Sequence, residues 1–492
     1  MRFQTASLAA ALLIVANCCP ALMRPASGQV TRADLAAAYL RVDHAYAEGH
    51  PGAVPAVEAH RTFDRISLSF FSGDFASAVR ALDALYLALR PDLDSPAMRA
   101  ALALRIEAEP PTITPGRGVA PTLQVSARYA PEGEEGAPRV WVRLRDPAGA
   151  VVFSALLPDI DPGARFVPLA VDAPRAGWSP GVYTIEIATA QRTLLDAGRL
   201  VVADSSLDTQ REALLARLRG MRPANEAMER AAHACASRLG LLADRPSPMQ
   251  SAQWLADQHA LLAATTAEVD AIEAGSDPYI RRTGDAWMSI RAAGQDVPLR
   301  IYVPEELAHA RVLAPIVVAI HGAGGDENMF MDAYGAGAVK RLADAHGLIV
   351  VAPLNTPIAN PAAFDDMIDF IAERWPVDRS RIILVGHSMG AGVAAAIGRA
   401  RPEGVRAVVC IAGPGMMGGA PGAAPTLVIG AGMDPIIPLA RIEQGVERAR
   451  GAGADIELRV KPDMGHTLVV TDTIDEALRW ALAQEGRDRN QP

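Results

Sequence analysis

Lysine and clustered positive charge are nearly absent from this sequence. Of its 492 residues, 47 are lysine or arginine, and the only lysines are Lys340 and Lys461. The 56 acidic residues bring the net charge to −9, and no stretch of the chain forms a basic stripe. A protein that binds nucleic acid must neutralise a phosphate backbone with positive charge. We therefore expect no nucleic-acid partner.

Apolar runs long enough to cross a bilayer are also missing from the sequence. Leu8–Ala16 is apolar but well below the roughly 20 residues that cross a bilayer. It follows Arg2 and precedes small residues at 26–28, which is the order of a secretory signal peptide. We predict that residues 1–28 are removed before Gln29. The mature protein is then secreted or periplasmic, with no membrane span.

Cysteine is scarce, and two of the four cysteines lie in this predicted signal. Cys18 ends the sequence VANC, which resembles a bacterial lipobox with asparagine at the place of the usual small residue. A lipid anchor at Cys18 is therefore the alternative to simple cleavage. An oxidising compartment would allow a disulfide between Cys235 and Cys410, whereas two buried free thiols are the simpler expectation. No histidine has ligand spacing with cysteines or acids, so we expect no metal and no other cofactor.

Three segments of different character precede the part of the chain that carries chemical motifs. Residues 29–108 are predicted to be helical, because apolar residues recur at helical spacing from Leu35 to Tyr46. Residues 109–204 alternate apolar and polar residues between turns, which predicts a small β-sandwich of immunoglobulin-like type, although the Cys-Trp-Cys hallmark is absent. Residues 205–280 return to helical spacing and are interpreted as a structural connector.

From residue 281 to 487, strands and helices are predicted to alternate. Continuous apolar runs of strand length occupy 316–320, 348–352, 381–385, 407–411 and 426–429. Such runs are typical of strands covered on both faces. With helical stretches between most of them, they predict an α/β fold with a doubly wound, mostly parallel sheet.

The motif Gly386-His387-Ser388-Met389-Gly390 directly follows one of these predicted strands and precedes a helical run of small residues. A serine hydroxyl is a weak nucleophile unless it is exposed, held rigidly and served by a base. A sharp turn from strand to helix provides the first two conditions, and flanking glycines relieve the crowding in such a turn. We predict that Ser388 is a nucleophile. The alternative is an inert turn.

An acid and a base are expected in loops after later strands. Asp434 follows the strand that ends at Ile429, and His466 follows a further predicted strand at 456–460. Sheets of this kind bind ligands beyond the carboxyl ends of their strands, and nucleophile, acid and base occur in this order along the chain. We predict Asp434 as the orienting acid and His466 as the general base. His387 and Asp463 are the rivals, with structural roles expected for both.

A second glycine-rich motif, His321-Gly322-Ala323-Gly324-Gly325, also follows a predicted strand. Backbone N–H groups must meet the oxyanion of an acyl-transfer intermediate, and glycines allow close approach. The expected oxyanion donors are the N–H of Met389 and one from Gly322 or Ala323, while His321 shapes the loop. A dinucleotide site is the rival interpretation, but the full six-residue glycine pattern is missing.

On these residues, the part of the chain from 284 to about 487 resembles an α/β-hydrolase of the esterase and polyester-depolymerase-like group. The matching features are the HGAGG loop, the GHSMG motif, the Asp434 loop and Gly465-His466. The resemblance implies a serine hydrolase that cleaves a small-molecule or polymeric carboxylic ester through an acyl-enzyme intermediate. Two alternatives are a prolyl-oligopeptidase-like peptidase, which the lack of propeller repeats disfavours, and a non-catalytic envelope binding protein with a relic hydrolase domain.

Short connections between the predicted strands leave little room for an inserted lid, so we expect an open cleft. Candidate residues for an acyl pocket follow the glycine-rich segments, and they are Met329, Phe330, Met331, Tyr334, Met416 and Met417. Packing within the core is an equally good explanation for these side chains.

Overall fold

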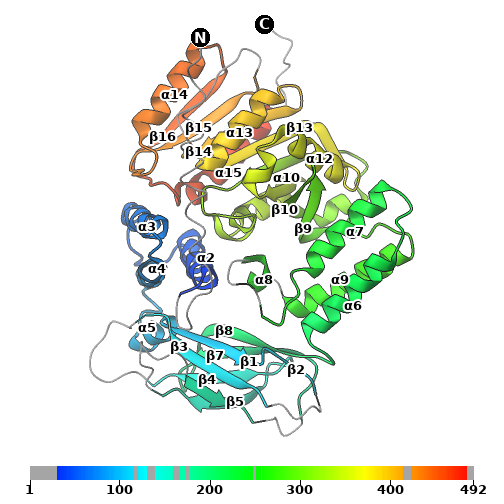
Figure 1. Ribbon diagram of the computed structural model, residues 1–492. Helices are drawn as coiled ribbons and strands as arrows, with labels where there is room; N and C mark the ends of the chain where they lie inside the picture. Colours follow the sequence, from blue (N-terminus) through cyan, green and yellow to red (C-terminus); the bar gives the residue numbers. More distant parts are fainter. Residues whose placement is uncertain are drawn as a thin grey trace.

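A computed structural model describes residues 30–115, 120–129, 139–158, 167–172, 177–245, 247, 251–255, 257–413 and 423–484 (Figure 1). The predicted signal with Cys18, and the pocket candidates Met416 and Met417, lie outside the described residues. Within the described ranges, none of the helices combines the length and apolar character needed to cross a bilayer.

The C-terminal part of the chain is built on an eight-stranded sheet with the spatial order β16-β15-β14-β13-β11-β12-β10-β9. Its strands are β9 (Gly284–Ala292), β10 (Gln295–Val303), β11 (Ala314–Ile320), β12 (Ile349–Pro353), β13 (Val377–His387), β14 (Val405–Ile411), β15 (Thr426–Ala431) and β16 (Ile456–Lys461). The pairs β9–β10 and β10–β12 are antiparallel, and the other neighbours are parallel. The predicted doubly wound, mostly parallel sheet is confirmed.

Helices cover both faces of this sheet, which explains why its central strands are apolar throughout. The helical elements are η1 (Glu305–His309), η2 (Met329–Ala333), α10 (Ala338–His346), α11 (Asn355–Ile358), α12 (Pro361–Ala372), α13 (Met389–Ala400), α14 (Leu439–Gly451) and α15 (Val469–Ala483). On β11, Ile316 and Val318 share one core with α12, α13 and α14. Val317 and Ala319 share the opposite core with α10 and α15. Side chains that point to either face of the strand are therefore removed from water.

Two details of this region differ from the sequence-based expectation. Strand β9 was not predicted, because it is an edge strand of mixed composition that pairs only with β10. Its hairpin turn places Ala293 and Gly294 at φ of 46° and 78°, a turn that alanine does not signal. The sequence favours a helix from about residue 475 after His466, whereas α15 begins at Val469, so His466 lies only three residues before it.

Helices α2 (Arg32–Glu48), α3 (Ala56–Phe71), α4 (Phe75–Leu89) and α5 (Pro96–Leu102) form the first described part of the chain. The side chain of Thr31 accepts a hydrogen bond from Asp34 N, and the Asp34 carboxylate accepts one from Thr31 N, which is a capping box at the start of α2. Asp74 caps α4, because its side chain accepts a hydrogen bond from Ser77 N. In Figure 1 these helices lie between the eight-stranded sheet and the strands that come next along the chain, from residue 104 onwards.

Residues 104–202 fold into two sheets with the orders β1-β3-β6 and β2-β8-β7-β4-β5. The strands are β1 (Leu104–Glu109), β2 (Thr112–Ile113), β3 (Thr122–Ala127), β4 (Trp141–Arg145), β5 (Val151–Leu156), β6 (Val167–Ala170), β7 (Gly181–Ala188) and β8 (Thr193–Val202). Leu123 and Val125 of one sheet share a core with Val142 and Ile185 of the other. The two sheets thus form a sandwich, while its immunoglobulin-like type and the exact domain boundaries stay predictions.

The connector consists of α6 (Leu207–Gly220), α7 (Glu226–Leu239), α8 (Ser251–Leu255) and α9 (Gln258–Glu273). Cys235 on α7 and Cys410 on β14 belong to the same large core, and both are buried free thiols. Within this connector, the buried Arg238 of α7 donates to Glu268 of α9 at 3.0 Å and to the carbonyl oxygen of Trp287 on β9 at 2.7 Å. The connector is therefore fastened to the edge of the large sheet.

Helix α2 is held against the C-terminal part by a buried carboxylate. Asp43 Oδ1 accepts hydrogen bonds from Thr471 Oγ1 at 2.8 Å and from Gly335 N at 3.3 Å. Burial raises the pKa of Asp43 to about 7, although both hydrogen bonds act in the opposite direction.

We expect Asp43→Asn to flatten the dependence of stability on pH. Between pH 4 and 7 the folded protein holds a proton on Asp43 that the unfolded chain releases, so the free energy of unfolding falls as the pH rises through this window. The loss reaches on the order of 4 kcal/mol above pH 7, at 1.36 kcal/mol for each pKa unit. The asparagine removes this loss, and thermal unfolding midpoints from pH 4 to 8 would measure it. Asp196→Asn, an exposed position on β8, is the matched control; equal pH slopes in all three proteins would refute the prediction.

Candidate active site

Ser388 occupies the sharp turn that joins β13 to α13. Its φ of 53° and ψ of −118° lie in a region that residues with a side chain rarely adopt. The turn is held by a hydrogen bond from Ser388 N to the carbonyl oxygen of Ile411 on the neighbouring strand β14, at 2.9 Å. The predicted strand–turn–helix setting of the GHSMG motif is therefore present.

The two glycines of this motif are required by close packing. A Cβ at Gly386 would lie 2.5 Å from the backbone nitrogen of Ala391, one turn into α13. A Cβ at Gly390 would lie 2.5 Å from the carbonyl oxygen of His321, at the end of β11. Without side chains at these two positions, α13 can start directly against two strands and hold the serine in place.

The structure brings the three predicted residues together, although 78 residues separate Ser388 from His466 along the chain. Ser388 Oγ lies 2.9 Å from His466 Nε2, and His466 Nδ1 lies 2.7 Å from Asp434 Oδ2. All three side chains are buried. The other carboxylate oxygen of Asp434 accepts hydrogen bonds at 2.8 Å from the backbone nitrogens of Ile436 and Ile437, which fix its orientation.

The two rival residues have the structural roles that were expected. His387 Nε2 donates to the carbonyl oxygen of His466 at 2.9 Å, so its Nδ1 accepts from the hydroxyl of Tyr334 at 2.8 Å. Burial lowers the pKa of His387 to about 3, which keeps its ring neutral. Asp463 lies exposed in the turn after β16.

The predicted oxyanion loop adjoins the serine. A Cβ at Gly322 would lie 3.1 Å from the Cβ of Ser388, which places this backbone in contact with the nucleophile candidate. His321 braces the loop, because its Nδ1 donates to the carbonyl oxygen of Gly322 at 2.8 Å and its Nε2 accepts from Asn355 N at 3.2 Å. Met389 opens α13, where first-turn N–H groups have no partner within the helix. The choice of Met389, Gly322 and Ala323 as oxyanion donors stays a prediction.

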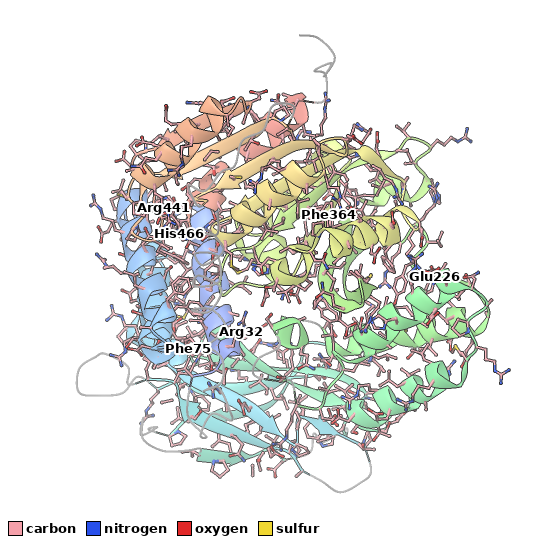
Figure 2. The ribbon with its side chains drawn as sticks, turned by 45° about the horizontal axis from the view of Figure 1, so that its top comes forward. Arg32, Phe75, Glu226, Phe364, Arg441 and His466 are labelled. Atoms are coloured by element: carbon pink, nitrogen blue, oxygen red, sulfur yellow. The ribbon has the colours of Figure 1, made fainter. Side chains whose placement is uncertain are left out.

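Two residues on helix α3 support the loop of His466, and the sequence analysis did not identify either of them. The backbone nitrogen of His466 donates to Asp64 Oδ1 at 3.0 Å, and that of Gly465 donates to His60 Nδ1 at 3.0 Å. His60 Nε2 in turn donates to Asp472 at 2.8 Å. Burial raises the pKa of Asp64 to about 6, against the hydrogen bond from His466. Figure 2 shows His466 where the C-terminal part meets the N-terminal helices.

A cavity of about 150 Å³ lies over the serine, and helices α2 and α3 cover part of it, which the expectation of an open cleft did not include. Its lining includes Ser388, His466 and the glycine-rich loop on one side, and side chains of α2 and α3 on the other. The cover comes from the N-terminal helices and not from an insertion between strands. Of the predicted pocket residues, Met329 and Tyr334 line this cavity, whereas Phe330 and Met331 pack into the core beneath it.

The described part of the chain holds no cluster of three or more histidine, cysteine, aspartate or glutamate side chains that could bind a metal. The groups that converge on the cavity are instead a hydroxyl, an imidazole and a carboxylate in hydrogen-bonded sequence. This arrangement suits proton transfer and nucleophilic attack.

Comparisons with known proteins agree with this fold. Residues 317–487 match the model of the alpha/beta hydrolase family, whereas no curated protein matches the sequence. Similar solved structures include a thermostable esterase, with 20% identity and a TM-score of 0.34 over 40% of this chain and 62% of that one. An S-formylglutathione hydrolase from Staphylococcus aureus has 14% identity and a TM-score of 0.35, covering 41% of this chain and all of that one. An esterase from Pyrobaculum calidifontis has 20% identity and a TM-score of 0.33, over 42% and 86% of the two chains.

The chain thus spans about 62% of the length of the thermostable esterase. The strand order, the turn at Ser388 and the family match give the C-terminal part the fold of the α/β-hydrolase type.

Proposed function

We propose that this protein is an exported serine hydrolase that cleaves carboxylic esters through an acyl-enzyme intermediate. The observation that carries the proposal is the continuous hydrogen-bonded chain from Ser388 Oγ through the imidazole of His466 to the carboxylate of Asp434. Such a chain provides a base in contact with a nucleophile and an acid in contact with the base.

Each group has a defined step in this mechanism. His466 Nε2 takes the proton of Ser388 as Oγ attacks the ester carbonyl, and Asp434 stabilises the imidazolium that forms. Backbone N–H groups of Met389 and of the Gly322–Ala323 segment would stabilise the oxyanion. The imidazolium then protonates the departing alcohol, which leaves the acyl group on Ser388. Water, deprotonated by the same imidazole, releases the acid and restores the serine.

An ester fits this cavity better than a peptide does. An extended peptide needs hydrogen-bond partners for its backbone on both sides of the scissile bond. The wall contributed by α2 and α3 is instead mainly aliphatic and aromatic. An uncharged ester loses little solvation in such surroundings, whereas unpaired peptide groups would be costly to bury.

We expect p-nitrophenyl esters to be hydrolysed and peptide anilides to be poor substrates, and we expect a fluorophosphonate probe to label the protein. Comparable turnover of the anilides would favour the peptidase alternative. A folded protein that neither reacts with the probe nor hydrolyses any ester would instead favour a binding protein. The proposed export is tested separately by the mass of the mature protein from cells, which would begin at Gln29 or at a lipidated Cys18.

A further inference from the structure

One wall of the cavity over Ser388 comes from the opposite end of the chain. Helix α2 contributes Arg32, Leu35, Ala36, Tyr39 and Leu40, and helix α3 contributes Phe63, Ile66, Ser67, Phe70 and Phe71. The facing wall contains the glycine-rich loop of the hydrolase domain together with Ser388 and His466. Any group bound next to the serine therefore contacts the N-terminal helices.

These helices are fastened around the cavity at several points. Arg32 at the start of α2 donates to the carbonyl oxygen of Gly324 at 3.2 Å. His44, three turns further along, contacts the carbonyl oxygen of Asp332 at 2.7 Å. Asp64 on α3 accepts from the backbone of His466. Because these contacts join α2 and α3 to three separate segments of the C-terminal part, the wall has a fixed position relative to the serine.

Phe70 packs directly on the glycine-rich loop. Gly324 has a φ of 76°, and a Cβ at this position would lie 2.5 Å from the Phe70 ring. The ring is itself held by Phe75, whose ring stacks on it with the centroids 5.8 Å apart. The phenyl group thus forms a boundary of the cavity close to the predicted oxyanion donors.

We propose that α2 and α3 form the acyl-binding pocket and that Leu35 and Phe70 set the length of acyl chain it accepts. This inference rests on the proposed function. During ester hydrolysis the acyl group stays attached to the serine while the alcohol leaves, so the mainly apolar space beside Ser388 suits the acyl group. The cavity of about 150 Å³ is lined mainly by aliphatic and aromatic side chains, and its Arg32 is paired with Asp326 at 3.4 Å; it is large enough for a ring the size of benzene. The substrate class is therefore esters of short, uncharged, apolar acids, with about four to six carbon atoms in the acyl chain.

The test varies the two halves of the ester separately. In one series, p-nitrophenyl esters from acetyl to dodecanoyl keep the leaving group constant. In the other, butanoyl esters of different alcohols keep the acyl group constant. We expect kcat/KM to peak at about four to six acyl carbons and to fall by about 10-fold or more for the dodecanoyl ester, because excess methylenes do not fit the pocket.

Two variants that change the pocket in opposite directions should move this peak. Phe70→Ala enlarges the cavity and should shift the optimum towards octanoyl and longer chains, whereas Leu35→Trp should shift it to acetyl. Matched controls on the sandwich are Phe153→Ala, at a partly buried position of β5, and Leu156→Trp, at an exposed position of the same strand. Both controls should keep the original profile, and circular dichroism would verify the fold of each variant.

The outcomes separate this inference from the proposed function. If both pocket variants fold, still react with the fluorophosphonate probe and keep the original acyl profile, the pocket assignment is wrong while the nucleophile assignment stands. A shift in the alcohol series instead of the acyl series also overturns the assignment. Failure of the unaltered protein to react with the probe would contradict the proposed function itself.

Discussion

The variant Ser388→Ala should lose ester hydrolysis by at least about 10⁴-fold, because Ser388 Oγ is the hydroxyl oxygen that contacts the proposed base His466. The serine side chain is small, and the strained turn is fixed by its backbone and by Gly386 and Gly390, so alanine should fit without loss of fold. Initial rates with a p-nitrophenyl ester would measure the effect, and reaction with a fluorophosphonate probe should disappear in parallel.

Ser154→Ala is the matched control for this variant. Ser154 is an exposed serine on β5 of the sandwich and is not among the residues that line the cavity. It should keep full activity and labelling. Retention of more than a few per cent of activity in a folded Ser388→Ala protein would show that another residue is the nucleophile.

Asp434→Asn should lower kcat by about 10³- to 10⁴-fold while leaving the fold intact. The reason lies in the two backbone N–H groups of Ile436 and Ile437, which donate to one oxygen of the side chain. They would hold the amide oxygen on their side and turn the amide NH₂ towards His466. Nδ1 must then be the acceptor, so Nε2 carries the hydrogen and cannot take the proton of Ser388.

The exposed Asp463 offers the matched control, since it is the other acid close to His466 in the sequence. Asp463→Asn should have almost unchanged kcat and KM. The opposite result, with activity lost in Asp463→Asn and kept in Asp434→Asn, would require a different acid in the mechanism.

The sequence could predict those parts of the site that depend on local signals. The central strands are apolar on both faces, and Ser388 and Asp434 follow two of them within a few residues, whereas His466 follows the edge strand β16. Parallel strands bring such loops to one edge of the sheet, so their convergence follows from the chain order. Strand β9 lacked this signal, because an antiparallel edge strand is neither continuously apolar nor strictly alternating.

The contribution of the N-terminal helices could not be predicted, because it depends on contacts between distant parts of the chain. His60 and Asp64 lie on one face of α3 at a spacing of four residues. In the sequence, this pair could indicate only that this face of the helix makes a polar contact. Nothing in the sequence indicated that their partners would be Gly465 and His466. The same long-range packing places α2 and α3 over part of the cavity at Ser388, and the short strand connections carried no sign of this partial cover.

The hydrogen bond between His466 and Asp64 joins residues 402 positions apart. During synthesis, α2 and α3 leave the ribosome well before the loop that they hold. A nascent chain that already contains the serine therefore still lacks its proposed base and the support of that base on α3. We expect enzyme activity to arise only after the segment with His466 has been made and has docked on α3.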